Sequence, residues 1–211
     1  HRFGFETNPA YDPANPVMGI DPGERLFPAR LQKVGYVTGC IGKWHLGRKA
    51  GMAPHEQGFV ESLLMASGLF LPEDDPNVVN ARLDFDPIDQ FLWARMTFAN
   101  SFNSGNEDRF EPGGYLTDYW TDESIKVIRA NRHRPFFLYL AHWGVHSPLQ
   151  ALKSDYEDLA HIRDHHQRVY SAMITALDRS VDRITSRLAE LGIADSTLIV
   201  FTSGNGGAAS A

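Results

Sequence analysis

Two nearly continuous apolar runs, separated by one long amphipathic segment, place the strongest constraint on the fold. The runs PFFLYLAHW (135–143) and STLIVFTS (196–203) have the length of strands and lack polar alternation. Such strands are typical of parallel sheets that are buried on both faces. Between them, apolar residues recur every three or four positions over 166–191, which predicts a helix that ends at Gly192. The order strand, helix, strand indicates a βαβ unit.

Weaker patterns elsewhere in the chain extend the same alternation. Residues 36–42 (YVTGCIG) are apolar and β-branched, which predicts a buried strand, and residues 24–34 before them predict a helix. A second helix is predicted over 121–132, capped by Thr121. Residues 48–115 are rich in turn-forming residues, and one short helix is expected there, around IDQFLWARM. The predicted fold class is α/β, with a mainly parallel sheet flanked by helices.

The composition and charge of the chain limit the classes of molecule that it is expected to bind. Its 211 residues are 43% hydrophobic and 22% charged, which suits a globular core. The net charge of −6 argues against a nucleic-acid-binding face, and no run approaches the ~20 apolar residues of a membrane span. We therefore expect neither a nucleic acid nor a membrane as partner. The single cysteine, Cys40, lies within a predicted strand and is expected to be a small buried apolar side chain.

Polar side chains follow each of the three predicted strands. Lys43 and His45 follow the first, His142 and His146 end and follow the second, and Asn205 follows the third between glycines. Ligands of parallel α/β sheets bind outside the carboxyl ends of the strands, so these residues are expected to form one site. In an extended segment, residues two apart point to the same side, which would let Lys43 and His45 face one small anion together.

Each of these residues also has a purely structural interpretation. Lys43 and His45 could be a solvated lysine and a packed histidine at a strand end. For His142 a packing role within the strand is preferred, whereas His146 lies beyond the strand and is the better candidate. Asn205 could be a turn residue with a positive φ, as asparagine often is.

Two further groups of polar residues are assigned to the surface. The histidines at 161, 165 and 166 resemble a metal cluster, but no cysteine or carboxylate stands beside them at ligand spacing. The charged residues of the long helix are expected to form its solvated face; they are Arg179, Asp182, Arg183 and Arg187.

Four segments of the chain together resemble the sulfatase family, within the alkaline-phosphatase-like superfamily. GYVTGCIGKWHLG (35–47) resembles the second sulfatase signature, and PFFLYLAHWGVHSPLQA (135–151) resembles the family's strand-plus-histidine segment. The segment 176–207 resembles the helix and strand that lead into the family's metal loop, and HEQGFVESL (55–63) fits as well. The resemblance implies an alkaline-phosphatase-like core and the hydrolysis of sulfate esters, on sugars or aryl compounds.

The resemblance also implies roles for individual residues. Lys43 and His45 would contact the sulfate, and His146 would contact an ester or sulfate oxygen, where it stabilises charge or protonates the leaving group. Asn205 would ligate a divalent metal, usually calcium. The implied partner is a sulfated small molecule or glycan. Lysine, histidine and a metal all stabilise the negative charge on sulfuryl oxygens.

The sequence departs from the family pattern at the nucleophile and at the metal loop. The family's formylglycine nucleophile is made from the Cys or Ser of Cys/Ser-x-Pro-x-Arg, and no such motif occurs here; Cys40 is followed by Ile-Gly-Lys. The early Asp-Asp metal ligands are absent, and Gly204 stands where the Asp of Asp-Asn-Gly is expected. We therefore expect residues 1–211 to be a single partial catalytic domain, without its nucleophile-bearing N-terminal part and its C-terminal part. By itself this part is expected to be inactive and to bind calcium weakly or not at all.

Two other functions remain open from the sequence. A phosphatase or phosphodiesterase could share the fold, although those enzymes lack the GKWHLG segment in this form. A non-catalytic binder of sulfated glycans could keep Lys43, His45 and His146. The residue at the nucleophile position would distinguish a phosphatase or phosphodiesterase from a sulfatase. Binding of a sulfated glycan without turnover would favour the non-catalytic binder.

Overall fold

The structure of this chain is a computed structural model. It describes residues 19–21, 23–24, 26–47, 49–66, 68–96, 98, 100–102 and 108–204. The strands are β1 (Val37–Gly42), β2 (Glu61–Met65), β3 (Val78–Ala81), β4 (Asn100–Phe102), β5 (Arg109–Phe110), β6 (Phe136–Ala141) and β7 (Leu149–Leu152). The α-helices are α1 (Phe27–Lys33), α2 (Pro87–Arg95), α3 (Leu116–Asn131), α4 (Lys153–Asp158) and α5 (His165–Glu190); short 3₁₀ turns, η1 and η2, span Pro54–Gln57 and Ala194–Ser196.

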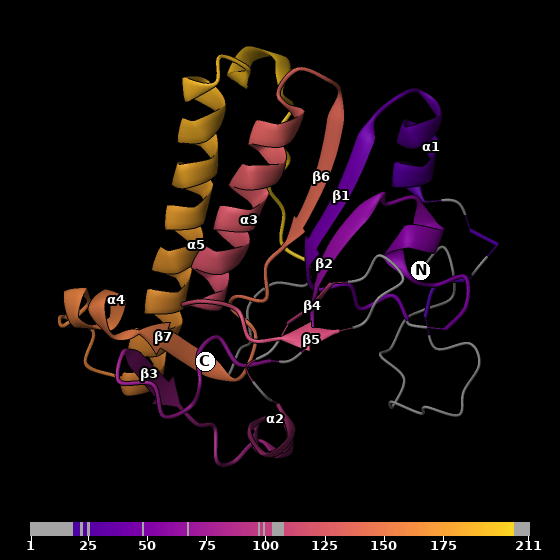
Figure 1. The fold of residues 1–211 in the computed structure, drawn as a ribbon. Helices are drawn as coiled ribbons and strands as arrows, with labels where there is room; N and C mark the ends of the chain where they lie inside the picture. Colours follow the sequence, from indigo (N-terminus) through magenta and orange to yellow (C-terminus); the bar gives the residue numbers. More distant parts are fainter. Residues whose placement is uncertain are drawn as a thin grey trace.

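The main sheet is built around β1. Its strand order is β5-β4-β2-β1-β6, and β1 pairs in parallel with both β2 and β6, whereas β4 and β5 are antiparallel. A small second sheet pairs β3 with β7. Helix α3 lies against one face of the main sheet, and α1 lies on the other; α5 packs alongside α3 and against the small sheet of β3 and β7 (Figure 1). The predicted α/β class, with a parallel sheet flanked by helices, is confirmed.

Alternate residues of β1 serve two cores on opposite faces of the sheet. Ile41 packs into the larger core together with α3 and α5, where Trp120 and Met173 are buried. Cys40 points to the smaller core with Phe59. This is the side-chain period of two that a strand imposes. The predictions of a buried first strand and a buried Cys40 are confirmed.

The four predicted helices are all present, but two begin elsewhere than predicted: α1 begins at Phe27, inside the predicted range 24–34, and α3 begins before the predicted cap. The predicted long helix corresponds to α5, and the short helix around IDQFLWARM corresponds to α2, whose Asp86 side chain accepts a hydrogen bond from the Ile88 N–H. Helix α3, however, begins at Leu116, so the predicted cap at Thr121 is wrong. The Thr121 hydroxyl is fully buried inside the helix, 2.7 Å from the Thr117 carbonyl and 2.6 Å from the Ser180 hydroxyl.

The two apolar runs behave differently from the prediction. Strand β6 forms but lies at the edge of the described sheet, and Tyr139 is 45% exposed, so it is not buried on both faces. Residues 197–203 form no strand: they follow η2 without regular secondary structure, with Leu198 89% and Phe201 77% exposed. A strand is held by a neighbour's N–H and C=O groups, and no described strand lies in ladder register with this segment. The expectation of a third buried strand is therefore wrong for the described structure.

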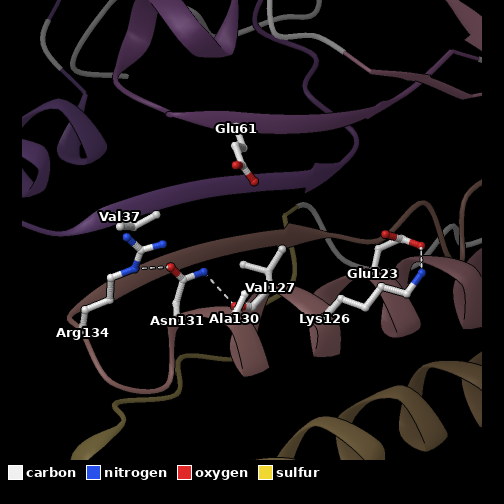
Figure 2. A pocket seen from close by; sticks show the side chains of 8 residues that line it. All are labelled: Val37, Glu61, Glu123, Lys126, Val127, Ala130, Asn131 and Arg134. Atoms are coloured by element: carbon white, nitrogen blue, oxygen red, sulfur yellow. Dashed lines mark hydrogen bonds and ion pairs between the residues drawn. The ribbon is translucent and has the colours of Figure 1, made fainter.

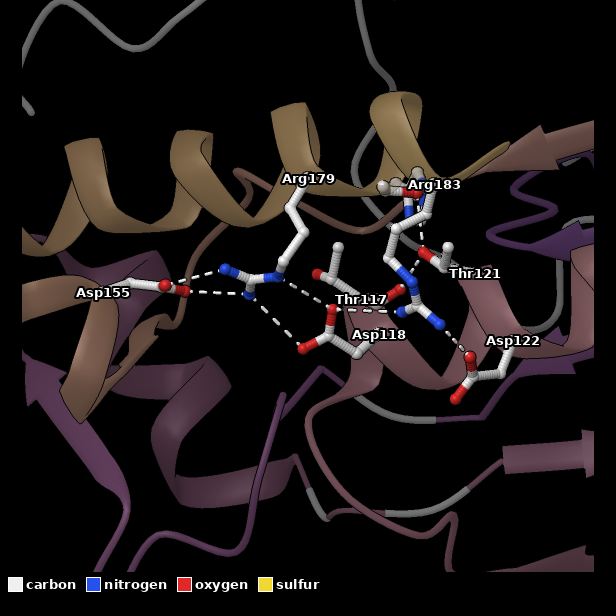
Figure 3. A network of polar contacts seen from close by, with 9 residues as sticks. Thr117, Asp118, Thr121, Asp122, Asp155, Arg179 and Arg183 are labelled. Atoms are coloured by element: carbon white, nitrogen blue, oxygen red, sulfur yellow. Dashed lines mark hydrogen bonds and ion pairs between the residues drawn. The ribbon is translucent and has the colours of Figure 1, made fainter. Parts of the chain in front are cut away.

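Charged side chains of α5 join three helices instead of facing solvent. The Arg179 guanidinium donates to both Asp155 carboxylate oxygens, at 2.7 and 2.9 Å, and reaches Asp118 at 3.3 Å (Figure 3). Arg183 pairs with Asp118 and Asp122 of α3. The predicted solvated face is therefore wrong at Arg179 and Arg183. The Asp155 carboxylate raises the pKa of Arg179 further above its ordinary value, so the guanidinium stays charged.

In the part of the chain that the structure describes, no helix has both the length and the apolar character needed to cross a lipid bilayer.

We predict that Arg179→Ala lowers the free energy of unfolding by about 2 kcal/mol, because it leaves the Asp155 carboxylate, only 8% exposed, without its partner. Urea unfolding measures this. Arg187→Ala is the control on the same helix: its partner Glu190 is 60% exposed, so a loss below about 1 kcal/mol is expected. Equal losses for the two variants would contradict the structural role of the Arg179 network.

Candidate functional site

The close approach of two strand ends positions the first candidate residue. At the end of β1, Gly42 has φ +101°, and a Cβ there would lie 2.0 Å from the Ala141 carbonyl oxygen. Only glycine fits this geometry. The next residue, Lys43, donates its backbone N–H to the same carbonyl at 2.8 Å. The first glycine of GKWHLG therefore lets β1 and β6 meet at their carboxyl ends, which puts Lys43 beside the loop that follows β6.

The loop after β1 is held by an indole. Trp44 Nε1 donates to the carbonyls of Gly47, at 3.1 Å, and Met52, at 2.9 Å, and the ring packs edge-on against Phe59. His45 adopts a left-handed backbone with φ +61°. The segment is thus not extended at His45, and the argument from alternating side chains fails there. Burial first, and then the positive charge of Lys43, two residues earlier in the chain, lowers the pKa of His45.

The loop after β6 brings a third basic group to the same place. The His146 ring stacks on Trp143, with centroids 3.9 Å apart, and Lys43 Nζ lies 4.4 Å from the centroid of the Trp143 ring. His146 Nδ1 lies 2.7 Å from the Ser147 carbonyl and so carries a proton, which leaves Nε2 as the nitrogen that can accept or donate toward a ligand. The structure thus brings Lys43 and His146 together on the Trp143 ring, and His45 lies two residues beyond Lys43 in the same loop.

These three groups carry or acquire positive charge and repel one another. Burial lowers the pKa of Lys43. Burial first, and then Lys43, lowers the pKa of His45. Burial also lowers the pKa of His146, assisted by Lys43 and His45, although the hydrogen bond to Ser147 acts in the opposite direction. No ion pair joins Lys43 to an acid within the described ranges. A bound anion would relieve this repulsion and raise the histidine pKa values.

His142 belongs to the core and not to this group. Its Nε2 lies 2.9 Å from the Ser180 hydroxyl, and its ring lies beside Trp120. Burial lowers its pKa to about 4. The packing interpretation of His142 is therefore confirmed, and its side chain stays neutral near pH 7.

The remaining sequence candidates have structural partners or are inert. His165 holds the Asn80 carbonyl with Nε2 and the Tyr156 hydroxyl with Nδ1, each at 3.0 Å, and His166 Nε2 lies 2.8 Å from the Arg82 carbonyl. These rings fasten the start of α5 to β3. Burial raises the pKa of the Cys40 thiol to about 12, so it is not a nucleophile.

A metal site cannot be assembled from what the structure describes. Asn205 lies outside the described residues, so its expected role is not tested. Within the described ranges, no group of three or more His, Cys, Asp or Glu side chains could hold a metal ion, and Gly204 offers no side-chain oxygen. Calcium takes six to eight oxygen ligands, so these residues do not fit it.

A separate depression lies at the opposite ends of the strands. A cavity of about 250 Å³ opens where β1 and β2 begin, beside α3 (Figure 2). Its charges are mixed: Lys126 pairs with Glu123, and Arg134 is bonded to Asn131. Because both acidic and basic side chains line this depression, it lacks the basic character of the site around Lys43.

Among the residues that the structure describes, Trp143 belongs to the site and was missed by sequence reasoning. It lies between two strand-end histidines in the sequence, at 142 and 146, and an aromatic residue at that position was the available signal. His146 lies in the same loop as Trp143, whereas Lys43 follows the neighbouring strand β1, so only the fold reveals the contact with Lys43.

Comparison with known proteins gives a consistent result. The family model Sulfatase matches residues 1–211. Human N-acetylgalactosamine-6-sulfatase is 32% identical over 98% of this chain and 38% of its own length, and mouse arylsulfatase J is 31% identical over 86% of this chain and 29% of its own. The crystal structure of Ps i-CgsB in complex with k-i-k-neocarrahexaose aligns with a TM-score of 0.65 and 25% identity, over 82% of this chain and 38% of that one. The chain thus spans well under half the length of these relatives.

We predict that Gly42→Ala costs at least about 2 kcal/mol of unfolding free energy, because the methyl group meets the Ala141 carbonyl and the left-handed φ is strained. Denaturant unfolding provides the measurement. Gly113→Ala is the control, since open space surrounds Gly113. If the Gly42 variant were as stable as the control variant, the close approach of β1 and β6 would not be required.

We predict that His142 makes the protein less stable in acid. The folded pKa of about 4 lies below the ordinary 6.5, so between these values the unfolded chain binds a proton that the folded chain does not. As pH falls from 6.5 to 4, stability should drop by an amount on the order of 3 kcal/mol, with no further loss from this group below pH 4. Unfolding curves at several pH values should show a flatter dependence in His142→Gln. The exposed His161→Gln should keep the wild-type slope, and equal slopes in all three proteins would refute the assignment.

Proposed function

The chain belongs to the sulfatase family, and we propose that the protein hydrolyses sulfate esters, with Lys43, His45 and His146 contacting the sulfuryl group. The observation that carries this proposal is the convergence of three basic groups at the carboxyl ends of β1 and β6. Parallel α/β sheets bind ligands there. A sulfate ester supplies the negative charge that these groups lack.

The proposed roles follow from the chemistry of each side chain. Lys43 is a permanent positive charge whose partial burial strengthens its interaction with sulfuryl oxygens. His45 adds a second donor. The leaving alkoxide must gain a proton when the S–O bond breaks, and His146 Nε2 is free to supply it once the ring is protonated. Substrate binding raises the pKa of His146, so the site becomes protonated when the anion enters.

The nucleophile and a complete metal site are not among the residues that support this proposal. No Cys/Ser-x-Pro-x-Arg motif is present in the sequence, and Cys40 is buried and protonated. We infer that residues 1–211 are the sulfate-contacting part of one larger catalytic domain. By themselves they bind the ester without attacking sulfur. Calcium binding by these residues should be weak, because Gly204 supplies no ligand and the described residues do not fit the ion.

The proposed substrate is a sulfated sugar or aryl compound. This is supported by the names of similar proteins, N-acetylgalactosamine-6-sulfatase and arylsulfatase J, and by the neocarrahexaose bound to Ps i-CgsB. A non-catalytic binder of sulfated glycans would use the same three basic residues. The two functions differ in turnover when the nucleophile is supplied. The family match argues against the phosphatase alternative.

We predict that the 211-residue chain binds 4-nitrophenyl sulfate without hydrolysing it. Histidine ring NMR signals should report binding, and absorbance should show no nitrophenol release. Lys43→Met should weaken binding about tenfold or more, because it removes the permanent charge. The matched control is Lys126→Met, whose lysine pairs with Glu123 on α3 at the opposite ends of the strands and should leave affinity unchanged. Equal affinities for the two variants would sink the proposed site, and turnover by the pure chain would sink the account of the nucleophile.

A further inference from the structure

We propose that Trp143 is the positioning residue of this site, holding the Lys43 ammonium and the His146 imidazole at a fixed separation. The inference deepens the proposed function, because it assigns the group that aligns two sulfate contacts that come from different strands. It does not require that the ligand be sulfate. The arrangement of Lys43 against His146 exists without any ligand and can be measured in the free protein.

The indole itself is fixed by its surroundings. Trp143 is only 7% exposed and belongs to the larger core. Its Nε1–H donates to the Gly68 carbonyl at 2.9 Å. A buried tryptophan whose N–H is bonded to backbone has little freedom to tilt or rotate. The ring therefore forms a rigid surface at the edge of an otherwise solvent-facing site.

Both functional groups lie against this ring. Lys43 Nζ is 4.4 Å from the ring centroid, well inside the range in which an aromatic face attracts a cation. The His146 ring stacks at 3.9 Å with an interplanar angle of 26°. The lysine side chain has four rotatable carbons and loses much entropy when it is held in one place. The contact with the ring selects one position for it.

The ring also acts on the repulsion within the site. Lys43 and His146 lie on the same indole, and the charges of Lys43 and His45 add to the effect of burial in lowering the pKa of His146. The π-face of an indole attracts cations and so offsets part of the cost of keeping them close. Without the ring, the flexible Lys43 side chain would swing toward water, and the two contacts would no longer face the same anion.

A second tryptophan supplies a close control for a purely structural role. Trp93 is 6% exposed, and the Arg82 guanidinium lies 4.5 Å from its ring centroid. It thus shares the burial and the cation contact of Trp143. It lies in α2 and has no contact with Lys43 or His146 among those described. Substitution of Trp93 should therefore cost stability without changing the candidate site.

The test is a double-mutant cycle on the pKa of His146, measured by NMR in the 211-residue chain without ligand. Lys43→Met should raise this pKa in the wild-type background, because a nearby positive charge is removed. In the Trp143→Leu background the same change should be at least about twofold smaller. In the Trp93→Leu background it should keep its full size. An undiminished effect of Lys43→Met with Trp143→Leu would overturn the proposal.

A conservative variant keeps the test valid if Trp143→Leu does not fold. Trp143→Phe retains an aromatic face but loses the bond to Gly68, so the Lys43 effect on His146 should be intermediate. The affinity for sulfate, measured by titration, is a second test. Trp143→Leu should weaken sulfate binding, and Trp143→Phe should weaken it less. Trp93→Leu should leave the affinity unchanged. If the wild type fails to bind sulfate while the cycle behaves as expected, the proposed function fails and the positioning role stands. If Trp143→Phe leaves both the Lys43 effect and the sulfate affinity unchanged, the positioning role fails.

Discussion

The contact between the ends of β1 and β6 is the constraint on which the candidate site depends. Gly42 has no side chain, so its backbone can approach the Ala141 carbonyl, and Lys43 donates its N–H to that same oxygen. The loops that leave the two strands therefore start side by side. A larger residue at this point would separate the strands where Lys43 and the loop carrying His146 must meet.

The helix layer and strand β7 stabilise the contact between the ends of β1 and β6. Helices α3 and α5 bury a common core against the sheet, with Trp120 and Met173 among its residues. The Arg179 network joins α3, α4 and α5, so the helix layer does not depend on apolar packing alone (Figure 3). Strand β7 follows the His146 loop directly and is paired with β3, which fixes the far end of that loop.

The electrostatics of the site favour an incoming anion. Burial lowers the pKa values of His45 and His146, and the positive charge of Lys43 lowers them further. Among the described residues, no carboxylate forms an ion pair with Lys43. Elsewhere in the described chain, arginines such as Arg179 and Arg183 are paired with carboxylates. The contrast is chemical: paired charges stabilise the helix layer, whereas the charges around Lys43 remain available for a ligand. Family membership and this charge arrangement are the two observations behind the proposed substrate chemistry.

The sequence by itself determined the local elements and the family. Periodicity of three to four predicted α5, the apolar runs predicted β1 and β6, and GKWHLG led to the family and to Lys43 and His45. These features are readable because helix periodicity and short motifs involve neighbours in the chain. Asn205 lies outside the described residues, and its role stays a prediction.

Only the tertiary structure decided the features that need distant partners. A strand requires a neighbour, so the apolar run 197–203 remained unpaired and β6 became an edge strand. The separation of His142 from His146 depended on Ser180, which lies on another element. The role proposed for Trp143 arose where two loops meet at one ring. Pairing, burial and charge balance are properties of side chains far apart in sequence, and a local pattern contains no record of them.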